Sequence, residues 1–100
     1  MGHAKPDELA DLAPLLDAVR AWEHVRETAP NVFYVKRVPF LHFHTDKTGG
    51  RWADVRRGAA WGPRLAIPRD AEARERAAFA AAVEECHKET VAQIRSPRKS

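Results

Sequence analysis

Residues 40–58 constrain the fold of this chain most, because they have the pattern of a β-hairpin. Side chains of a strand point alternately to the two faces of its sheet. On both sides of Gly49 and Gly50, apolar residues alternate with polar and charged ones. The pattern therefore predicts two antiparallel strands with one apolar face and one polar face.

The length of the connecting loop decides which side chains share a face. A two-residue loop would mix polar and apolar side chains on both faces, which burial penalises. We therefore predict an odd-length loop at residues 48–50, with Lys47 opposite Arg51. A glycine late in this loop suits the left-handed conformation that a loop of this kind requires.

This register assigns partners to both histidines of the hairpin. We expect His44 opposite Asp54 and His42 opposite Arg56, together on the polar face, with Phe43 opposite Val55 on the core face. The same register adds to the polar face Phe40, Asp46 and Trp52, and to the core face Leu41 and Ala53.

The segments outside the hairpin predict two helices and two more strands. Apolar residues recur with helical spacing before Pro30 and again after Asp70, a good N-cap, and β-branched and aromatic residues fill the stretch after Pro30. We expect a helical turn at 7–12, a helix from about Pro14 to just before Pro30, strands at 32–38 and 64–67, and a helix over 70–94.

This element order predicts an α+β fold in two layers. Short connections favour a four-stranded antiparallel meander, and each helix has one apolar stripe to place on it. We expect both helices on one sheet face and the histidines on the other, open face. Residues 1–100 fit one small domain with loose termini at about 1–6 and 96–100.

Composition indicates the cellular compartment in which we expect the protein. One cysteine, Cys86, allows no internal disulfide, which fits a reducing cytosol, and its place on a helical stripe predicts a core residue. No apolar run has membrane-spanning length, and acidic residues interrupt the N-terminal segment where a signal peptide would be apolar. We therefore expect a soluble cytoplasmic protein without a membrane partner.

Several reaction classes are excluded by the residues present. Serine occurs only at Ser96 and Ser100, in the expected tail, which argues against a serine nucleophile. The glycines lack the spacing of a P-loop or a dinucleotide fingerprint. A single cysteine excludes thiol-rich zinc sites and paired-thiol redox motifs.

A metal site is the first candidate for the polar face. The spacing of His42 and His44 puts both imidazoles on one side of a strand, and Asp54 or Asp46 would supply a third ligand. Zinc, iron or manganese use such a set. The alternative is that these are ordinary polar residues of a wet sheet face, and no other cofactor is predicted.

Catalysis without a metal is the second candidate. A carboxylate at Asp54 would orient the imidazole of His44 as an acid–base pair, and Arg56 would hold an anionic substrate. The alternative is an ordinary cross-strand charge pair.

Binding through the open face is the third candidate and the leading one. The face offers aromatic and charged anchors at His42, His44, Trp52, Asp54 and Arg56, with Phe40, Tyr34 and Lys36 near them. Such anchors suit a protein partner or a homodimer first, then a small anionic ligand. Single-stranded nucleic acid uses similar surfaces, but a net charge of +3 is a weak indication of it.

The sequence thus predicts a non-enzymatic binding or interaction module that uses the open sheet face. The alternative is a small enzyme or metal-binding protein centred on His42, His44 and Asp54. Of the other tryptophans, Trp22 is expected in the core and Trp61 is expected to pack against a sheet edge. The residues name no substrate, partner or pathway.

Overall fold

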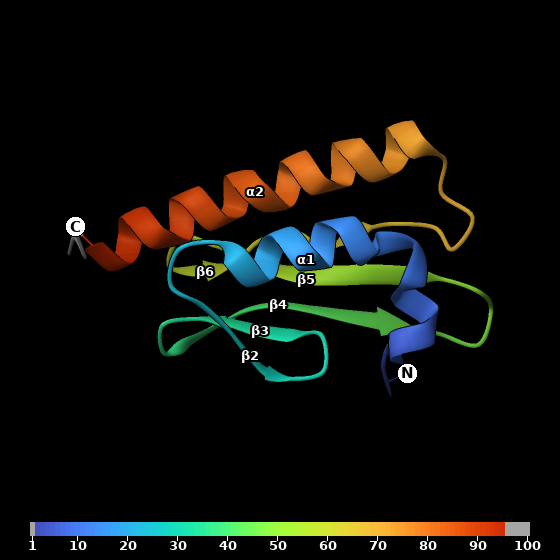
Figure 1. Ribbon diagram of the computed structural model, residues 1–100, viewed down its shortest axis with the longest axis horizontal. Coiled ribbons are helices and arrows are strands. Elements are labelled where there is room, and N and C mark those ends of the chain that lie inside the picture. The colour runs from blue at the N-terminus through green and yellow to red at the C-terminus, as the bar shows by residue number, and fades with distance from the viewer. Residues whose placement is uncertain (1, 96–100) are drawn as a thin grey trace.

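The computed structural model describes residues 2–95 and has two layers, with both helices on one face of an antiparallel sheet (Figure 1). This is the α+β fold that the sequence predicts. The helical elements are a 3-10 helix η1 at Pro6–Leu12, α1 at Ala13–Ala21 and α2 at Ala73–Arg95. Within residues 2–95, no helix is both long and apolar enough to cross a lipid bilayer.

The sheet has more strands than the four predicted. Its main path runs β2-β3-β4-β5-β6, while β1 pairs with β4 and β7 pairs with β5. The strands are β1 at Gly2–His3, β2 at Val25–Ala29, β3 at Val32–Val35, β4 at Val38–Thr45, β5 at Arg51–Arg57, β6 at Ala60–Trp61 and β7 at Leu65–Ala66. The short β6 and β7 line the outer edge of β5, where one strand was expected.

The first helix is shorter than predicted, because the chain reverses at His24. His24 has a left-handed backbone with φ 68°, and its carbonyl accepts a hydrogen bond from the Lys36 amide at 2.9 Å. The prediction of a helix up to Pro30 was therefore wrong, and the chain from Val25 onward is an edge strand. Trp22 lies at the end of the helix, half-buried, with its ring 5.0 Å from that of His87.

The expected strand at 32–38 is also divided. Lys36 has φ 55°, and Val35 pairs directly with Val38, so the chain turns back between them. Pro39, the residue directly after the expected strand, lies inside β4. A second reversal joins β2 to β3 at Asn31, where φ is 60°, a value that asparagine tolerates better than most residues.

The predicted register of the hairpin was wrong, because each residue of β4 pairs two positions earlier on β5 than expected. The assignment of the paired side chains to the two faces was right. Thr45 pairs with Arg51, so the loop covers residues 46–50 rather than 48–50. The carboxylate of Asp46 accepts hydrogen bonds from the Thr48 and Gly50 amides at 3.0 Å and 2.8 Å, and the Asp46 amide donates to the Gly50 carbonyl at 3.1 Å. These contacts close the longer loop. The longer loop is still odd in length, so the apolar side chains remain together.

The shifted register gives each histidine a different partner from the expected one. His42 lies opposite Asp54, and His44 lies opposite Trp52. Phe43 lies opposite Ala53, still on the core face. His44 and Asp54, expected to lie directly opposite each other, are therefore diagonal neighbours on the same face, and so are His42 and Arg56.

Phe40 does not belong to the open face. Pairing between β3 and β4 is irregular at this point, since Tyr34 pairs with Pro39 but Phe33 pairs with Leu41. Phe40 is fully buried, and its ring lies 5.8 Å from that of His87 on α2. The irregularity therefore turns Phe40 toward the helices, which strict alternation could not predict.

Within the described residues, the N-terminal segment, which was expected to be loose at 1–6, pairs with β4. Gly2 pairs with Thr45, and the Ala4 amide donates to the Phe43 carbonyl at 3.0 Å. The helical turn expected at 7–12 is present as η1. The expected loose tail at 96–100 lies outside the described residues.

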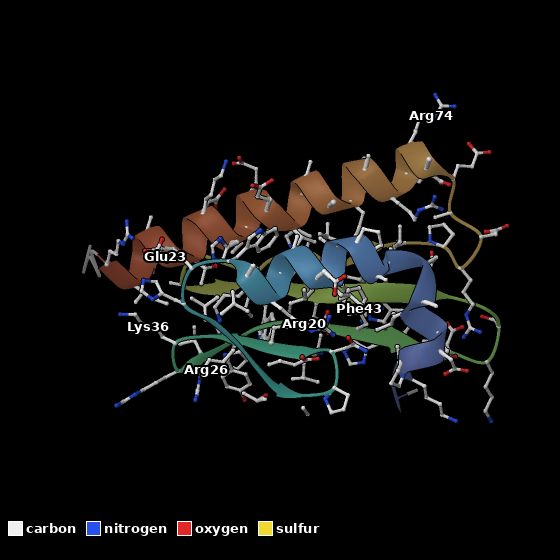
Figure 2. All side chains as sticks on the ribbon, in the orientation of Figure 1. Arg20, Glu23, Arg26, Lys36, Phe43 and Arg74 are labelled. Atoms are coloured by element: carbon white, nitrogen blue, oxygen red, sulfur yellow. The ribbon has the colours of Figure 1, made fainter. Side chains whose placement is uncertain are left out.

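The core fills the space between the sheet and the two helices, where Phe43 points toward α1 (Figure 2). The apolar stripe predicted for the second helix is confirmed, although this helix begins at Ala73 rather than near Asp70. The buried apolar residues include Leu9, Leu12, Leu16, Val19, Phe33, Val35, Phe40, Leu41, Phe43, Ala53, Val55, Ile67, Phe79, Val83 and Cys86. Burial raises the pKa of the Cys86 thiol, as befits a core cysteine.

A buried arginine, which was not predicted, connects several elements at one end of this fold. The side chain of Arg51 is 1% exposed, and it forms a two-pronged ion pair with Asp11 at 2.7 Å and 2.9 Å. Its other donors bind the carbonyl oxygens of Glu8, Ile67 and Pro68 at 2.7 Å, 2.8 Å and 2.9 Å. Arg51 therefore connects η1, the start of β5 and the segment after β7.

Replacing Arg51 with methionine should destabilise the protein strongly. The change leaves the Asp11 carboxylate without its cation and three carbonyl groups without a donor, a loss of about 3–5 kcal/mol. Urea denaturation measures it. The control Arg57→Met removes an exposed pair with Glu89 and should cost about 1 kcal/mol or less. Equal losses in the two variants would contradict this role of Arg51.

Low pH should weaken the ion pair between Arg51 and Asp11. The hydrogen bond from Arg51 lowers the pKa of Asp11 below its ordinary value of 3.8. The contribution of Asp11 to stability is therefore complete above that ordinary pKa and is lost as the pH falls through the lower, folded value. Urea titrations at several acidic pH values should show a steeper decline for the wild type than for Arg51→Met.

Candidate functional site

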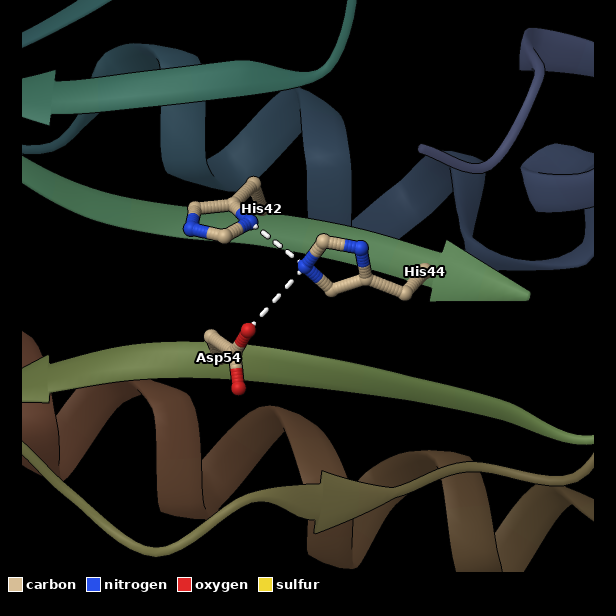
Figure 3. A group of neighbouring side chains, drawn as sticks. All are labelled: His42, His44 and Asp54. Carbon is tan, nitrogen blue, oxygen red and sulfur yellow. Dashed lines mark hydrogen bonds and ion pairs between the residues drawn. The ribbon is translucent and has the colours of Figure 1, made fainter. Parts of the chain in front are cut away.

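Three side chains meet on the sheet face that the helices leave open. His42 and His44 extend from β4, Asp54 extends from β5, and both helices lie behind the sheet (Figure 3). Nδ1 of His42 is 2.9 Å from Nε2 of His44, and Oδ2 of Asp54 is 3.0 Å from the same Nε2. We call these three residues the triad.

The triad has no proton arrangement in which each of its close contacts is a separate, favourable hydrogen bond. If Nε2 of His44 carries a proton, that proton is shared between Asp54 and the lone pair of His42 Nδ1. If Nδ1 of His42 carries it instead, the lone pair of His44 Nε2 faces an ionised carboxylate. When the ring protons are on the other two nitrogens instead, His42 Nδ1, His44 Nε2 and an Asp54 oxygen each turn a lone pair toward one small region.

The spacing of these atoms matches that of metal ligands. Metal bonds of about 2.0–2.1 Å place neighbouring ligand atoms about 2.9 Å apart in an octahedron and about 3.4 Å apart in a tetrahedron. Two of the spacings in the triad are 2.9 Å and 3.0 Å, and all three ligand atoms lie within 4.8 Å of one another. The triad therefore offers two nitrogens and one oxygen close enough for small side-chain movements to bring them onto one ion.

The same geometry argues against an acid–base pair of His44 and Asp54. In such a pair the carboxylate binds one ring nitrogen, and the other nitrogen exchanges a proton with the substrate. Asp54 binds Nε2, which leaves Nδ1 for the reaction, and Nδ1 of His44 is fully buried. A substrate cannot reach that nitrogen, so metal coordination fits the triad better than catalysis by this pair.

The triad remains accessible from one side. The side chain of His44 is 15% exposed and that of Asp54 is 32% exposed. Trp61 lies across β5 from the histidines, with its ring 5.1 Å from His42, while Trp52 is stacked on His44 at 5.6 Å. Two tryptophans thus flank the triad, and Trp61 is 43% exposed.

Two arginines cover these tryptophans. The guanidinium of Arg56 is 5.1 Å from the ring centre of Trp61, and that of Arg64 is 4.6 Å from the ring centre of Trp52. Arg56 is fixed further by hydrogen bonds to the carbonyl oxygens of Pro39 and Ala59 at 2.7 Å and 3.1 Å. The open face is therefore positively charged on both sides of the triad.

The structure brings together most residues that the sequence placed on this face. His42, His44 and Asp54 are in direct contact, and Arg56 lies beside them on β5. Asp46, the other suggested ligand, is instead held in the loop, where a hydrogen bond from Thr48 lowers its pKa.

Trp61 and Arg64 were not predicted as parts of the site. Trp61 was expected to pack at a sheet edge, yet it leans over β5 toward His42 because it pairs with Arg56. The sequence signal that could have indicated this is weak: a tryptophan between two glycines, Gly58 and Gly62, in a segment of small residues.

A separate groove of about 590 Å³ lies between the two helices. Its lining is mainly apolar and includes Leu15, Trp22, Ala77 and Ala81. The groove shares no residue with the triad and lies on the helical side of the sheet. Its described lining also has three ionisable side chains, Asp11, Arg76 and Glu84, but Asp11 is already paired with Arg51. The triad, whose ligand atoms converge, is therefore the better candidate site.

Trp52 should tolerate the loss of its indole nitrogen. Trp52 is 8% exposed, and within residues 2–95 its buried Nε1 has no hydrogen-bond acceptor. A buried donor without a partner costs about 1–3 kcal/mol. We expect Trp52→Phe to lower the free energy of unfolding by less than about 1 kcal/mol, because removal of this donor offsets the lost packing. A loss above about 3 kcal/mol in urea would show that Nε1 has an acceptor.

Comparison with known proteins adds no family to these observations. No protein-family model, no curated protein sequence and no solved structure matches this chain.

Proposed function

We propose that this protein is a non-enzymatic binding module whose open sheet face binds one divalent transition-metal ion at His42, His44 and Asp54. The observation that carries the proposal is the convergence of His42 Nδ1, His44 Nε2 and an Asp54 carboxylate oxygen within 4.8 Å. We expect the module to be cytoplasmic, because its single buried cysteine would stay reduced there.

The donor atoms favour a particular class of ion. Imidazole nitrogens suit zinc, iron, cobalt, nickel and copper, whereas calcium and magnesium prefer sites made only of oxygen. Two imidazoles and one carboxylate leave at least one coordination position for another ligand. We therefore expect zinc or a neighbouring transition metal to bind, and magnesium to compete weakly.

Association of two chains through the same face is supported less well. An interface needs a cluster of exposed anchors, and among the described residues Trp61 is the large apolar side chain that is exposed. Phe40 and Trp52, which would have widened such a surface or a platform for nucleic-acid bases, are buried. The compact triad is therefore the stronger basis for a function.

Untagged protein should bind one zinc ion per chain, as measured by isothermal titration calorimetry. Replacing both His42 and His44 with alanine should weaken binding by more than about 100-fold, because changes outside the coordination sphere already cost 10- to 100-fold. Binding should also weaken as the pH falls, because the ligands must lose their protons to coordinate the ion.

The control is His24→Asn, which removes one imidazole far from the triad. His24 lies in the turn between α1 and β2 with φ 68°, a conformation that asparagine also adopts. This variant should bind zinc as the wild type does. Absence of stoichiometric zinc in the wild type, or equal affinity in the double alanine variant, would refute the proposal.

A further inference from the structure

We infer that the metal-loaded triad takes a small aromatic carboxylate as its exchangeable ligand, with the carboxylate on the metal and Arg56 and the ring against Trp61. This inference rests on the proposed metal site, and it names the class of molecule that occupies the remaining coordination position. Three features of the site support it: the charge of the loaded site, the position of Arg56 and the exposure of Trp61.

The charge of the loaded site calls for an anion. A divalent ion with one carboxylate ligand keeps a net charge of about +1, and the arginines beside it add to that charge. Within residues 2–95, neither Arg56 nor Arg64 forms an ion pair with a carboxylate. Asp54 is thus the acidic member of a face that becomes clearly positive when the ion binds.

Arg56 is held in place to receive such an anion. Asp54 and Arg56 are two residues apart on β5, so their side chains leave the sheet on the same face. Hydrogen bonds from Nε and Nη1 to two backbone carbonyl oxygens fix the guanidinium, and none of these acceptors is charged. Nη2 forms no hydrogen bond to any described residue, so it can donate to an incoming carboxylate.

Trp61 supplies the apolar part of the site. It is 43% exposed, its ring is 5.1 Å from that of His42, and Arg56 lies over it at 5.1 Å. A ligand on the open position of the metal would therefore have an exposed indole next to it. A planar ring suits this surface, because aromatic rings gain about 0.5–1.5 kcal/mol from contact beyond the area that they bury.

Benzoate is the probe, and its binding is followed by calorimetry on protein that carries one zinc ion per chain. Benzyl alcohol has the same ring without the charge, and acetate has the charge without the ring. Benzoate should bind the zinc-loaded wild type more tightly than either compound does, and should not bind the metal-free protein. Equal affinity of acetate would overturn the role of Trp61, and equal affinity of benzyl alcohol would overturn that of the anion.

Variants at saturating zinc test the two residues separately. Arg56→Gln should weaken benzoate binding about tenfold or more. Arg74→Gln, which removes an equal charge at the outer end of α2, should not change it (Figure 2). Trp61→Ala should weaken binding about two- to tenfold, whereas Trp61→Phe keeps a ring and should lose less.

The outcomes separate this inference from the proposed function. If zinc does not bind the wild type, the metal site itself fails. If zinc binds but benzoate does not, or if benzoate binds Arg56→Gln as tightly as the wild type, only the aromatic carboxylate is excluded. Unfolding of Arg56→Gln, detected by circular dichroism, leaves the pair Trp61→Ala and Trp61→Phe to decide, and equal affinities in that pair overturn the inference.

Discussion

The buried ion pair between Arg51 and Asp11 is the interaction on which the arrangement of this protein depends most. It forms where β5 begins, directly after the hairpin loop, and it ties that point to η1 and to the segment after β7. At the same point Arg51 pairs with Thr45 on β4. That register is what sets His42 opposite Asp54 and brings His44 within reach of the same carboxylate.

The two faces of the hairpin could be predicted from the sequence, but the pairing of individual residues could not. The alternation around Leu41, Phe43 and Val55 requires an odd-length loop, and the structure has one. Alternation cannot distinguish two odd lengths. In the longer loop, the Asp46 carboxylate accepts hydrogen bonds from loop amides, and these contacts are not visible in an apolar periodicity. The triad was therefore predicted as a group, with its internal contacts assigned to the wrong neighbours.

The ends of elements were harder to predict wherever the chain reverses without glycine. His24, Asn31 and Lys36 all have left-handed backbones, and each marks a turn. Histidine and lysine are ordinary helix or strand residues, so nothing local indicates a reversal at His24 or Lys36. The sequence from Val25 to Ala29 fits a helix as well as a strand, and it forms a strand because it pairs with β3. Trp61 was misjudged for a related reason, since its side chain crosses β5 to reach His42.

The separation of the triad from the core has a consequence for how an ion would be handled. The apolar residues that hold the helices to the sheet lie on one side of it, and the histidines lie on the other. A hydrogen bond and an ion pair already keep the three side chains together. Small zinc-finger domains unfold when their ion leaves, because their fold is built around it. Here the domain would keep its shape through loading and release, so the ion would behave as exchangeable cargo rather than as a structural support.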